Sequence, residues 1–78
     1  MAELLAHLAR KLVDEPDAVE VEEVQREGAT VLQLRVAKAD VGKVIGRQGR
    51  IARALRTLVR ASAAREGRRV LVEIADPE

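Results

Sequence analysis

The hydrophobic period of this chain changes several times within 78 residues, and each change falls near a proline or a glycine. The first pattern is helical and rests on four leucines, Leu4, Leu5, Leu8 and Leu12. We expect this helix to end near 14–15, because a residue that precedes proline, here Pro16, is pushed out of the α region. Segments this short bury apolar surface only against one another, so the chain is expected to form one domain with a modest core.

Alternating side chains predict a pair of strands after the proline. Valine alternates with glutamate over 19–22, and a second segment carries on one face Thr30, Leu32, Leu34 and Val36. Gly28 marks a short turn between the two segments, so we expect an antiparallel hairpin. The alternation slips by one residue before Val24, which allows a bulge or a frayed strand end there.

The second half of the chain predicts two helices. Asp40 is a suitable N-cap for a short helix over 41–45, which Gly46 ends. A longer helix over about 50–66 follows, and Gly67 is its natural C-terminal cap. From spacing alone, the inner stripe of this helix consists of Ile51, Leu55, Leu58 and Ser62.

Alternation at Val70, Val72 and Ile74 predicts a last strand, and residues 76–78 are expected to form a short C-terminal tail. The order of elements is therefore α-β-β-α-α-β. This order predicts an α+β fold in which three helices pack on one face of a three-stranded sheet. We expect a single domain over 1–78, with its core at about 3–75.

The segment Gly46-Arg47-Gln48-Gly49 joins the two predicted helices and carries the strongest functional signal in the sequence. Two glycines at this spacing arise by chance about once in three chains of this length, so the pattern alone also fits a simple helix-turn-helix corner. An apolar pair precedes the segment and an amphipathic helix follows it, which favours a binding loop. Backbone without a Cβ admits a close phosphate, and the N-terminus of the following helix favours an anion.

Basic side chains are concentrated around this loop. Residues 28–69 carry eleven basic and two acidic side chains, a net charge of +9, whereas 1–27 carry −5 and 70–78 carry −3. Such a segment attracts polyanions, although the whole chain has a net charge of only +1. The cations expected to neutralise successive phosphates are Lys43, Arg47, Arg50 and Arg53.

Apolar side chains beside the loop are candidates for the floor of a groove, namely Val44, Ile45 and Ile51, with Leu34 and Val36 as its wall. For Ile45, Ile51 and the two strand residues the alternative is ordinary core packing. The chain contains no aromatic residue, so it has no platform on which a base stacks. Bases in such a groove are therefore expected to be held by packing and by hydrogen bonds to their edges.

The segment 41–51, with the sequence VGKVIGRQGRI, resembles the signature of KH domains. The α-β-β-α-α-β order is similar to the type II, prokaryotic arrangement of that fold. The short length, the turn over 12–17 and the helical segment 56–60 closely resemble the stand-alone KhpA family, over about residues 3–75. The resemblance implies a cytoplasmic RNA chaperone that clamps about four nucleotides of single-stranded RNA over its loop. It also implies self-association and pairing with KhpB, a larger protein that contains a KH domain.

The expected RNA-binding residues are Gly46, Arg47, Gln48, Gly49, Lys43, Arg50, Arg53, Val44 and Ile45. Arg56 and Arg60 share a helix face with Arg53, and for these two a solvated surface and RNA contact are equally compatible with the sequence. Two other functions stay open. One is a protein–protein interaction module whose basic helix docks an acidic partner, and the other is an accessory factor for ribosome assembly.

No catalytic or metal-binding constellation is visible in the sequence. His7 is the single histidine, Ser62 is the single serine, and cysteine is absent. We therefore expect no enzymatic activity, no metal site and no cofactor. No apolar run approaches the ~20 residues of a membrane span, so a cytoplasmic protein with no membrane partner is expected.

The long helix carries apolar side chains outside its expected inner stripe, at Ala52, Val59 and Ala63. A domain this small holds only a few nucleotides, and doubling the number of sites raises avidity through effective concentration. We therefore expect a homodimer that uses part of this helix.

Overall fold

The computed structural model describes residues 1–75, and the expected tail over 76–78 lies outside the described residues. The helices are α1 (Ala2–Arg10), α2 (Val41–Ile45) and α3 (Arg50–Arg65), and the strands are β1 (Glu20–Arg26), β2 (Ala29–Arg35) and β3 (Val70–Ile74). Short 3-10 turns lie at Pro16–Ala18, Lys38–Asp40 and Arg47–Gly49. The predicted α-β-β-α-α-β order and the α+β fold class are confirmed.

The three strands form one mixed sheet in the order β1-β2-β3. β1 and β2 pair antiparallel from Glu20↔Arg35 to Arg26↔Ala29, as expected for a hairpin. β2 and β3 pair in parallel from Thr30↔Val70 to Leu34↔Ile74. A parallel pair requires a long crossover connection, and this connection contains α2, the glycine loop and α3.

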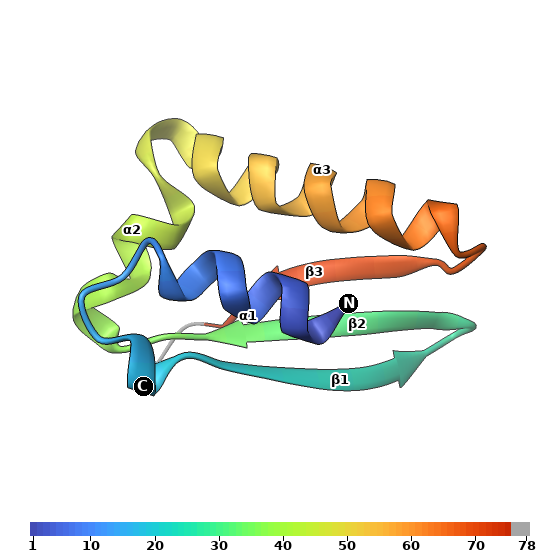
Figure 1. The fold of residues 1–78 in the computed structure, drawn as a ribbon, viewed down its shortest axis with the longest axis horizontal. Coiled ribbons are helices and arrows are strands. Elements are labelled where there is room, and N and C mark those ends of the chain that lie inside the picture. Colours follow the sequence, from blue (N-terminus) through green and yellow to red (C-terminus); the bar gives the residue numbers. More distant parts are fainter. Residues whose placement is uncertain (76–78) are drawn as a thin grey trace.

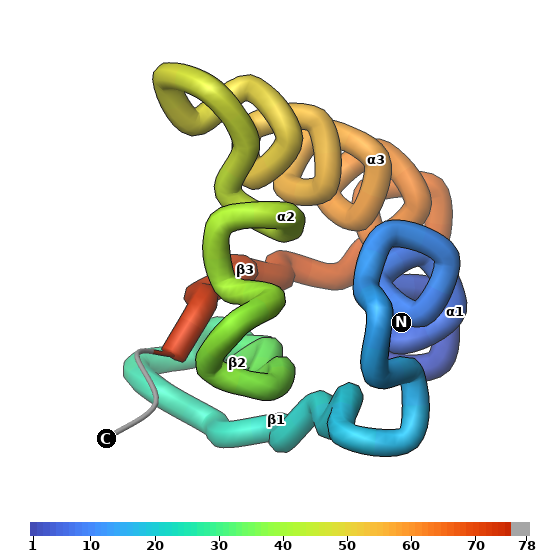
Figure 2. The backbone as a smooth tube through the Cα atoms, turned by 90° about the vertical axis from the view of Figure 1, so that its left-hand side faces the viewer, coloured from blue at the N-terminus to red at the C-terminus, as the bar shows by residue number. Residues whose placement is uncertain are grey.

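The helices lie on one face of the sheet (Figure 1). α3 packs mainly on β3 and α1 mainly on β1, while α2 lies at one end and joins α3 through the loop. Figure 2, turned by 90°, shows that the other face of the sheet carries no helix. The core between the layers includes the fully buried side chains Leu5, Leu32, Leu34, Val44 and Val59.

The expected inner stripe of α3 is confirmed at Leu55 and wrong at Leu58. The helix buries Ala52, Leu55, Val59 and Ala63, whereas Leu58 is 53% exposed. Two of the four buried residues are alanines, whose small side chains let the helix approach its neighbours closely. This gain in packing outweighs the burial of one leucine. The same finding corrects the expected dimer surface, because Ala52, Val59 and Ala63 lie in the interior.

β1 contains no bulge at Val24, because the pairing with β2 continues without a break from 20 to 26. Val24 belongs to the open face of the sheet, in one row with Val31 and Leu71. Val31 is only 1% exposed although no helix covers this face. A salt bridge of 3.2 Å joins Arg26 on β1 to Glu73 on β3. In the register of the sheet these two residues lie on either side of the row that contains Val31. The apparent slip in the alternation thus marks a small apolar cluster on the open face.

α1 ends at Arg10, earlier than the expected 14–15. The backbone N–H groups of Asp14 and Glu15 donate to the Asp40 carboxylate, at 3.3 and 3.0 Å, instead of to helix carbonyls. Asp40 precedes α2 as expected, but its side chain makes no capping hydrogen bond to that helix. Its carboxylate is occupied by a loop 25 residues away in the chain, so the expected N-cap role is wrong.

Candidate nucleic-acid interface

The loop between α2 and α3 has an unusual backbone at three positions. Gly46, Gln48 and Gly49 have φ values of 76°, 57° and 74°, in the left-handed region that favours glycine. Gln48 adopts this conformation despite its side chain. The loop therefore makes a tight reversal that leads directly into the first turn of α3.

The two glycines of the loop have different surroundings. A Cβ built at Gly46 would lie 2.6 Å from Ile51 Cγ1 and 2.9 Å from the Ile51 backbone nitrogen. A Cβ at Gly49 would meet no other described part of the chain within 4 Å, apart from the adjoining backbone. Gly46 thus allows α3 to pack closely against the loop, and of the two only Gly49 leaves open space at the surface. The expectation that both glycines open the backbone to a phosphate applies by geometry to Gly49.

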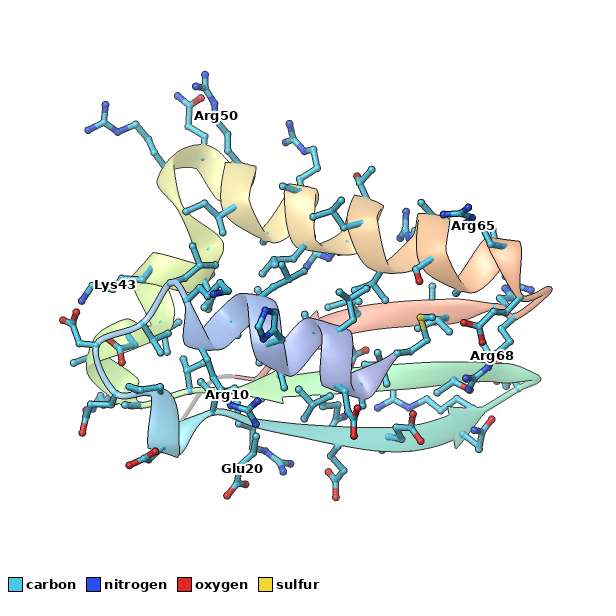
Figure 3. All side chains as sticks on the ribbon, in the orientation of Figure 1. Arg10, Glu20, Lys43, Arg50, Arg65 and Arg68 are labelled. Atoms are coloured by element: carbon cyan, nitrogen blue, oxygen red, sulfur yellow. The ribbon has the colours of Figure 1, made fainter. Side chains whose placement is uncertain are left out.

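Exposed cationic side chains surround this open position. Arg47, Arg50 and Arg53 are exposed, and within residues 1–75 none of them forms a salt bridge. Arg50 extends into solvent from the loop end of α3 (Figure 3). Gly49 is the N-cap of α3 and supplies no side chain to its first turn, where N–H groups and the helix dipole favour an anion. The structure thus brings together four of the expected residues: Arg47, Gly49, Arg50 and Arg53.

Lys43 lies apart from this cluster. Its Nζ donates to Asp14 Oδ2 at 2.7 Å and to Asp40 Oδ1 at 3.3 Å. The hydrogen bond to Asp14, followed by the one to Asp40, raises the pKa of Lys43 above its ordinary value. Figure 3 shows Lys43 on α2, well below the end of α3 that carries Arg50. Its charge is already balanced by two carboxylates, so the phosphate contact expected from the sequence does not fit this geometry.

Asp40 is the buried anion of this small network, with 1% of its surface exposed. Burial by itself raises the pKa of a carboxyl group, but the N–H groups of Asp14 and Glu15 and the ammonium of Lys43 outweigh it. The pKa of Asp40 is therefore lowered. These contacts attach the loop that follows α1 to the start of α2, immediately before the glycine loop.

The apolar candidates divide between the core and the surface. Leu34 and Val36 are buried in the core, as the alternative interpretation held. Val44 is also fully buried in the core, so its expected place on the floor of an RNA-binding groove is wrong. Ile45 and Ile51 are only partly buried. Only these two isoleucines therefore remain as apolar surface next to the loop.

Arg56, for which the sequence left a solvated surface and RNA contact equally open, makes a contact within the fold. Its Nε donates to the backbone carbonyl of Val72 at 3.3 Å, which links the middle of α3 to β3. Arg53 and Arg60 lie three and four residues away on the same flank of the helix. Helical spacing does not reveal a contact between residues 16 apart in the chain. The sequence therefore gave no signal that Arg56 contacts β3 rather than solvent.

In residues 1–75 no group of histidine, cysteine, aspartate and glutamate side chains is arranged to hold a metal ion. The helices of this part of the chain are also too short or too polar to cross a membrane.

Comparison with protein families gives a match to the KH domain of KhpA and KhpB over residues 2–74. A Treponema pallidum protein named RNA-binding protein KhpA is 58% identical over 74 residues, which cover 95% of this chain and 92% of the relative. A protein of the same name from Caldanaerobacter subterraneus subsp. tengcongensis is 55% identical, with 95% and 99% covered. A more distant one from Chlamydia trachomatis is 42% identical over 76 residues, with 97% of each chain covered.

Among solved structures, the chain is similar to an Aquifex aeolicus Era variant crystallised with GDP and aluminium fluoride. The TM-score is 0.71 at 19% sequence identity. The similar region covers 94% of this chain but only 28% of the Era chain. At this identity the similarity shows a shared fold alone.

Proposed function

The chain belongs to the KhpA/KhpB family of KH domains, and we propose that it is a single, non-catalytic KH domain that binds single-stranded RNA. Its relatives at 42–58% identity are named RNA-binding proteins. The observation that carries the mechanism is the open backbone at Gly49 between Arg47 and Arg50, two cations without a salt bridge to any other residue of 1–75. The phosphate backbone of about four nucleotides lies over this loop.

Each part of the loop has a distinct task in this mechanism. Gly49 admits a phosphate, and the first turn of α3 supplies N–H groups and a favourable dipole. Arg47, Arg50 and Arg53 neutralise phosphates on either side, which positions the strand without selecting a sequence. Ile45 and Ile51 supply apolar surface beside the loop, in place of the stacking residues that the chain lacks.

Replacement of Arg47 and Gln48 together by aspartate tests this mechanism. Both side chains are exposed, so the fold is expected to survive. Two carboxylates next to Gly49 repel a phosphate and weaken the positive field of the helix N-terminus. The affinity for a short single-stranded RNA should therefore fall at least about tenfold, a change of ~1.4 kcal/mol. Circular dichroism and a melting curve verify the fold. If the folded double variant binds RNA as tightly as the parent, the loop is not the site and docking of an acidic protein on the basic helix becomes the better explanation.

We further propose a homodimer formed by the exposed face of α3. A shallow groove on this face is lined by Ala54, Thr57 and Leu58, with Arg50 and Arg53 at its end next to the loop, where they stay available to RNA. Leu58 is 53% exposed and is the most exposed large apolar side chain in residues 1–75. Burial of this leucine against a second copy removes apolar surface from water, which favours association.

Family membership supports two additional proposals, a cytoplasmic location and pairing with KhpB. The family model that matches residues 2–74 describes the KH domains of both KhpA and KhpB. Size-exclusion chromatography of the two purified proteins, separately and mixed, tests the pairing. Co-elution at a larger apparent mass supports it, and unchanged separate peaks at tens of micromolar contradict it.

A further inference from the structure

Arg56 connects α3 to the outer edge of β3. The hydrogen bonds Thr30 N–H to Arg69 C=O and Ala75 N–H to Leu34 C=O show that residues 69 and 75 direct their backbone toward β2. Because the backbone alternates along a strand, Val72 directs its carbonyl to the opposite side, away from β2. The Nε of Arg56 donates to this outward carbonyl at 3.3 Å.

This single contact orients the arginine and leaves most of its donors available. A guanidinium has five N–H donors in one plane, and the Nε–H is the one used here. Within residues 1–75 neither Nη atom of Arg56 has a hydrogen-bond or salt-bridge partner. The side chain is partly buried, so its position is restricted by packing as well. Two parallel donors are thus presented in a fixed direction beside β3.

Arg56 is placed where it can reach an RNA strand that is bound at the glycine loop. Arg56 lies six residues after Arg50, roughly 9 Å along the helix axis. It is on the flank of α3 that faces β3, together with the exposed Arg53 and Arg60. An RNA strand that runs from Gly49 along this flank directs its bases toward the Nη groups of Arg56 and the outer edge of β3.

We propose that Arg56 is a specificity-determining residue that selects a base with two adjacent hydrogen-bond acceptors, guanine or cytosine, within the bound RNA. This inference rests on the proposed RNA binding at the glycine loop. Guanine presents O6 and N7, and cytosine presents O2 and N3, as neighbouring acceptors that match the two Nη donors of an arginine fork. In adenine the N6 amino donor lies between the acceptors N1 and N7, and in uracil the N3–H donor lies between O2 and O4. Each of these bases therefore accepts a hydrogen bond from only one of the two Nη groups.

A role restricted to stability is the competing explanation. Arg56 also covers part of the unpaired edge of β3, and charged side chains protect such edges from pairing with other chains. A purely protective arginine changes stability or aggregation but does not change the preference among bases. The discriminating measurement is therefore the ratio of affinities for different RNAs rather than any single affinity.

The test uses the whole chain and four single-stranded RNA octamers: uridine throughout, or uridine with one central guanine, cytosine or adenine. Fluorescence polarisation gives the four dissociation constants for the parent, Arg56→Lys and Arg56→Met. The parent should bind the guanine or the cytosine octamer at least about fivefold more tightly than the uridine octamer, the lower end for a bidentate pair. Both variants should lose this preference, and Arg56→Lys should keep the affinity for the uridine octamer because it retains the charge.

Arg60→Met is the matched control, since Arg60 lies on the same flank and has no backbone partner within residues 1–75. It should weaken all four complexes alike and leave their ratios unchanged. A parent that binds RNA without preferring guanine or cytosine overturns the assignment of Arg56, as does a preference that survives in both variants. A parent that binds none of the four RNAs overturns the proposed function itself, and this inference with it.

Discussion

The missing side chain of Gly46 faces Ile51, whose Cγ1 would lie 2.6 Å from a Cβ at that position. Real Cβ atoms essentially never approach a heavy atom so closely, so any other residue here forces α3 away from the loop. Gly49, three residues later, has a left-handed backbone but open space around it. The first glycine is therefore required for packing, whereas the second leaves the surface accessible.

This difference predicts unequal effects of substitution on stability. Gly46→Ala should lower the free energy of unfolding by roughly 2–6 kcal/mol, from overpacking and from a backbone region that is almost exclusive to glycine. Gly49→Asn should change it by less than about 1 kcal/mol, because asparagine tolerates the left-handed region. Urea denaturation of both variants measures the difference. Equal losses of unfolding free energy in the two variants would show that the contact with Ile51 does not restrict the side chain at position 46.

The salt dependence of RNA binding should report three phosphate contacts. Each phosphate contact on a single strand contributes about −0.7 to the slope of log affinity against log salt concentration. The slope should therefore be about −2 if each of three side chains, Arg47, Arg50 and Arg53, contacts one phosphate. Arg50→Met should reduce the magnitude of the slope by about 0.7, since it removes one contact.

Lys43→Met is the control for this series, because Lys43 is already paired with Asp14 and Asp40. It should leave the slope unchanged, once a melting curve has verified that the variant is folded. A reduction equal to that of Arg50→Met would restore Lys43 to the binding site. A slope near zero for the parent would refute the phosphate clamp whatever its affinity.

The network around Asp40 predicts a loss of stability in acid. The pKa of this carboxyl is lowered in the folded protein, so the ionised form stabilises the fold above the unfolded pKa of about 4. That contribution should disappear as the pH falls through the lower pKa of the folded state. Lys43 has a raised pKa, and its contribution is lost only at alkaline pH, above about 10.5.

Asp40→Asn isolates this effect, because it keeps the shape of the side chain but cannot ionise. It should be less stable than the parent at pH 7, and the difference between the two should shrink below about pH 4. Urea denaturation at several pH values between 7 and 2 measures both curves. A difference that stays constant over this range would show that ionisation of Asp40 does not contribute.

Self-association should depend on Leu58. Leu58→Lys places a charge in the exposed groove of α3 and should shift the protein to a monomer without unfolding it, because the side chain is 53% exposed. Leu71→Lys is the matched control on the open face of the sheet, where Leu71 is 39% exposed. Sedimentation at tens of micromolar distinguishes the two. A parent that is already monomeric there, or a Leu58 variant that remains dimeric, would count against this interface.

The sequence alone determined the order of the elements and the position of the loop. Both depend on local physics, because hydrophobic period distinguishes helix from strand and because Pro16, Gly28 and Gly46 separate successive elements. The exposed cations Arg47 and Arg50 could also be placed, since they follow directly from the ends of α2 and α3.

Tertiary structure alone decided which side chains those elements present. The buried face of α3 depends on how closely alanines such as Ala63 let the helix approach the rest of the core, and spacing does not encode that distance. The charge of Lys43 is balanced by Asp14, 29 residues away, and Arg56 is oriented by Val72, 16 residues away. A local pattern predicts that a residue is cationic, but whether its charge is free depends on partners that only folding brings near.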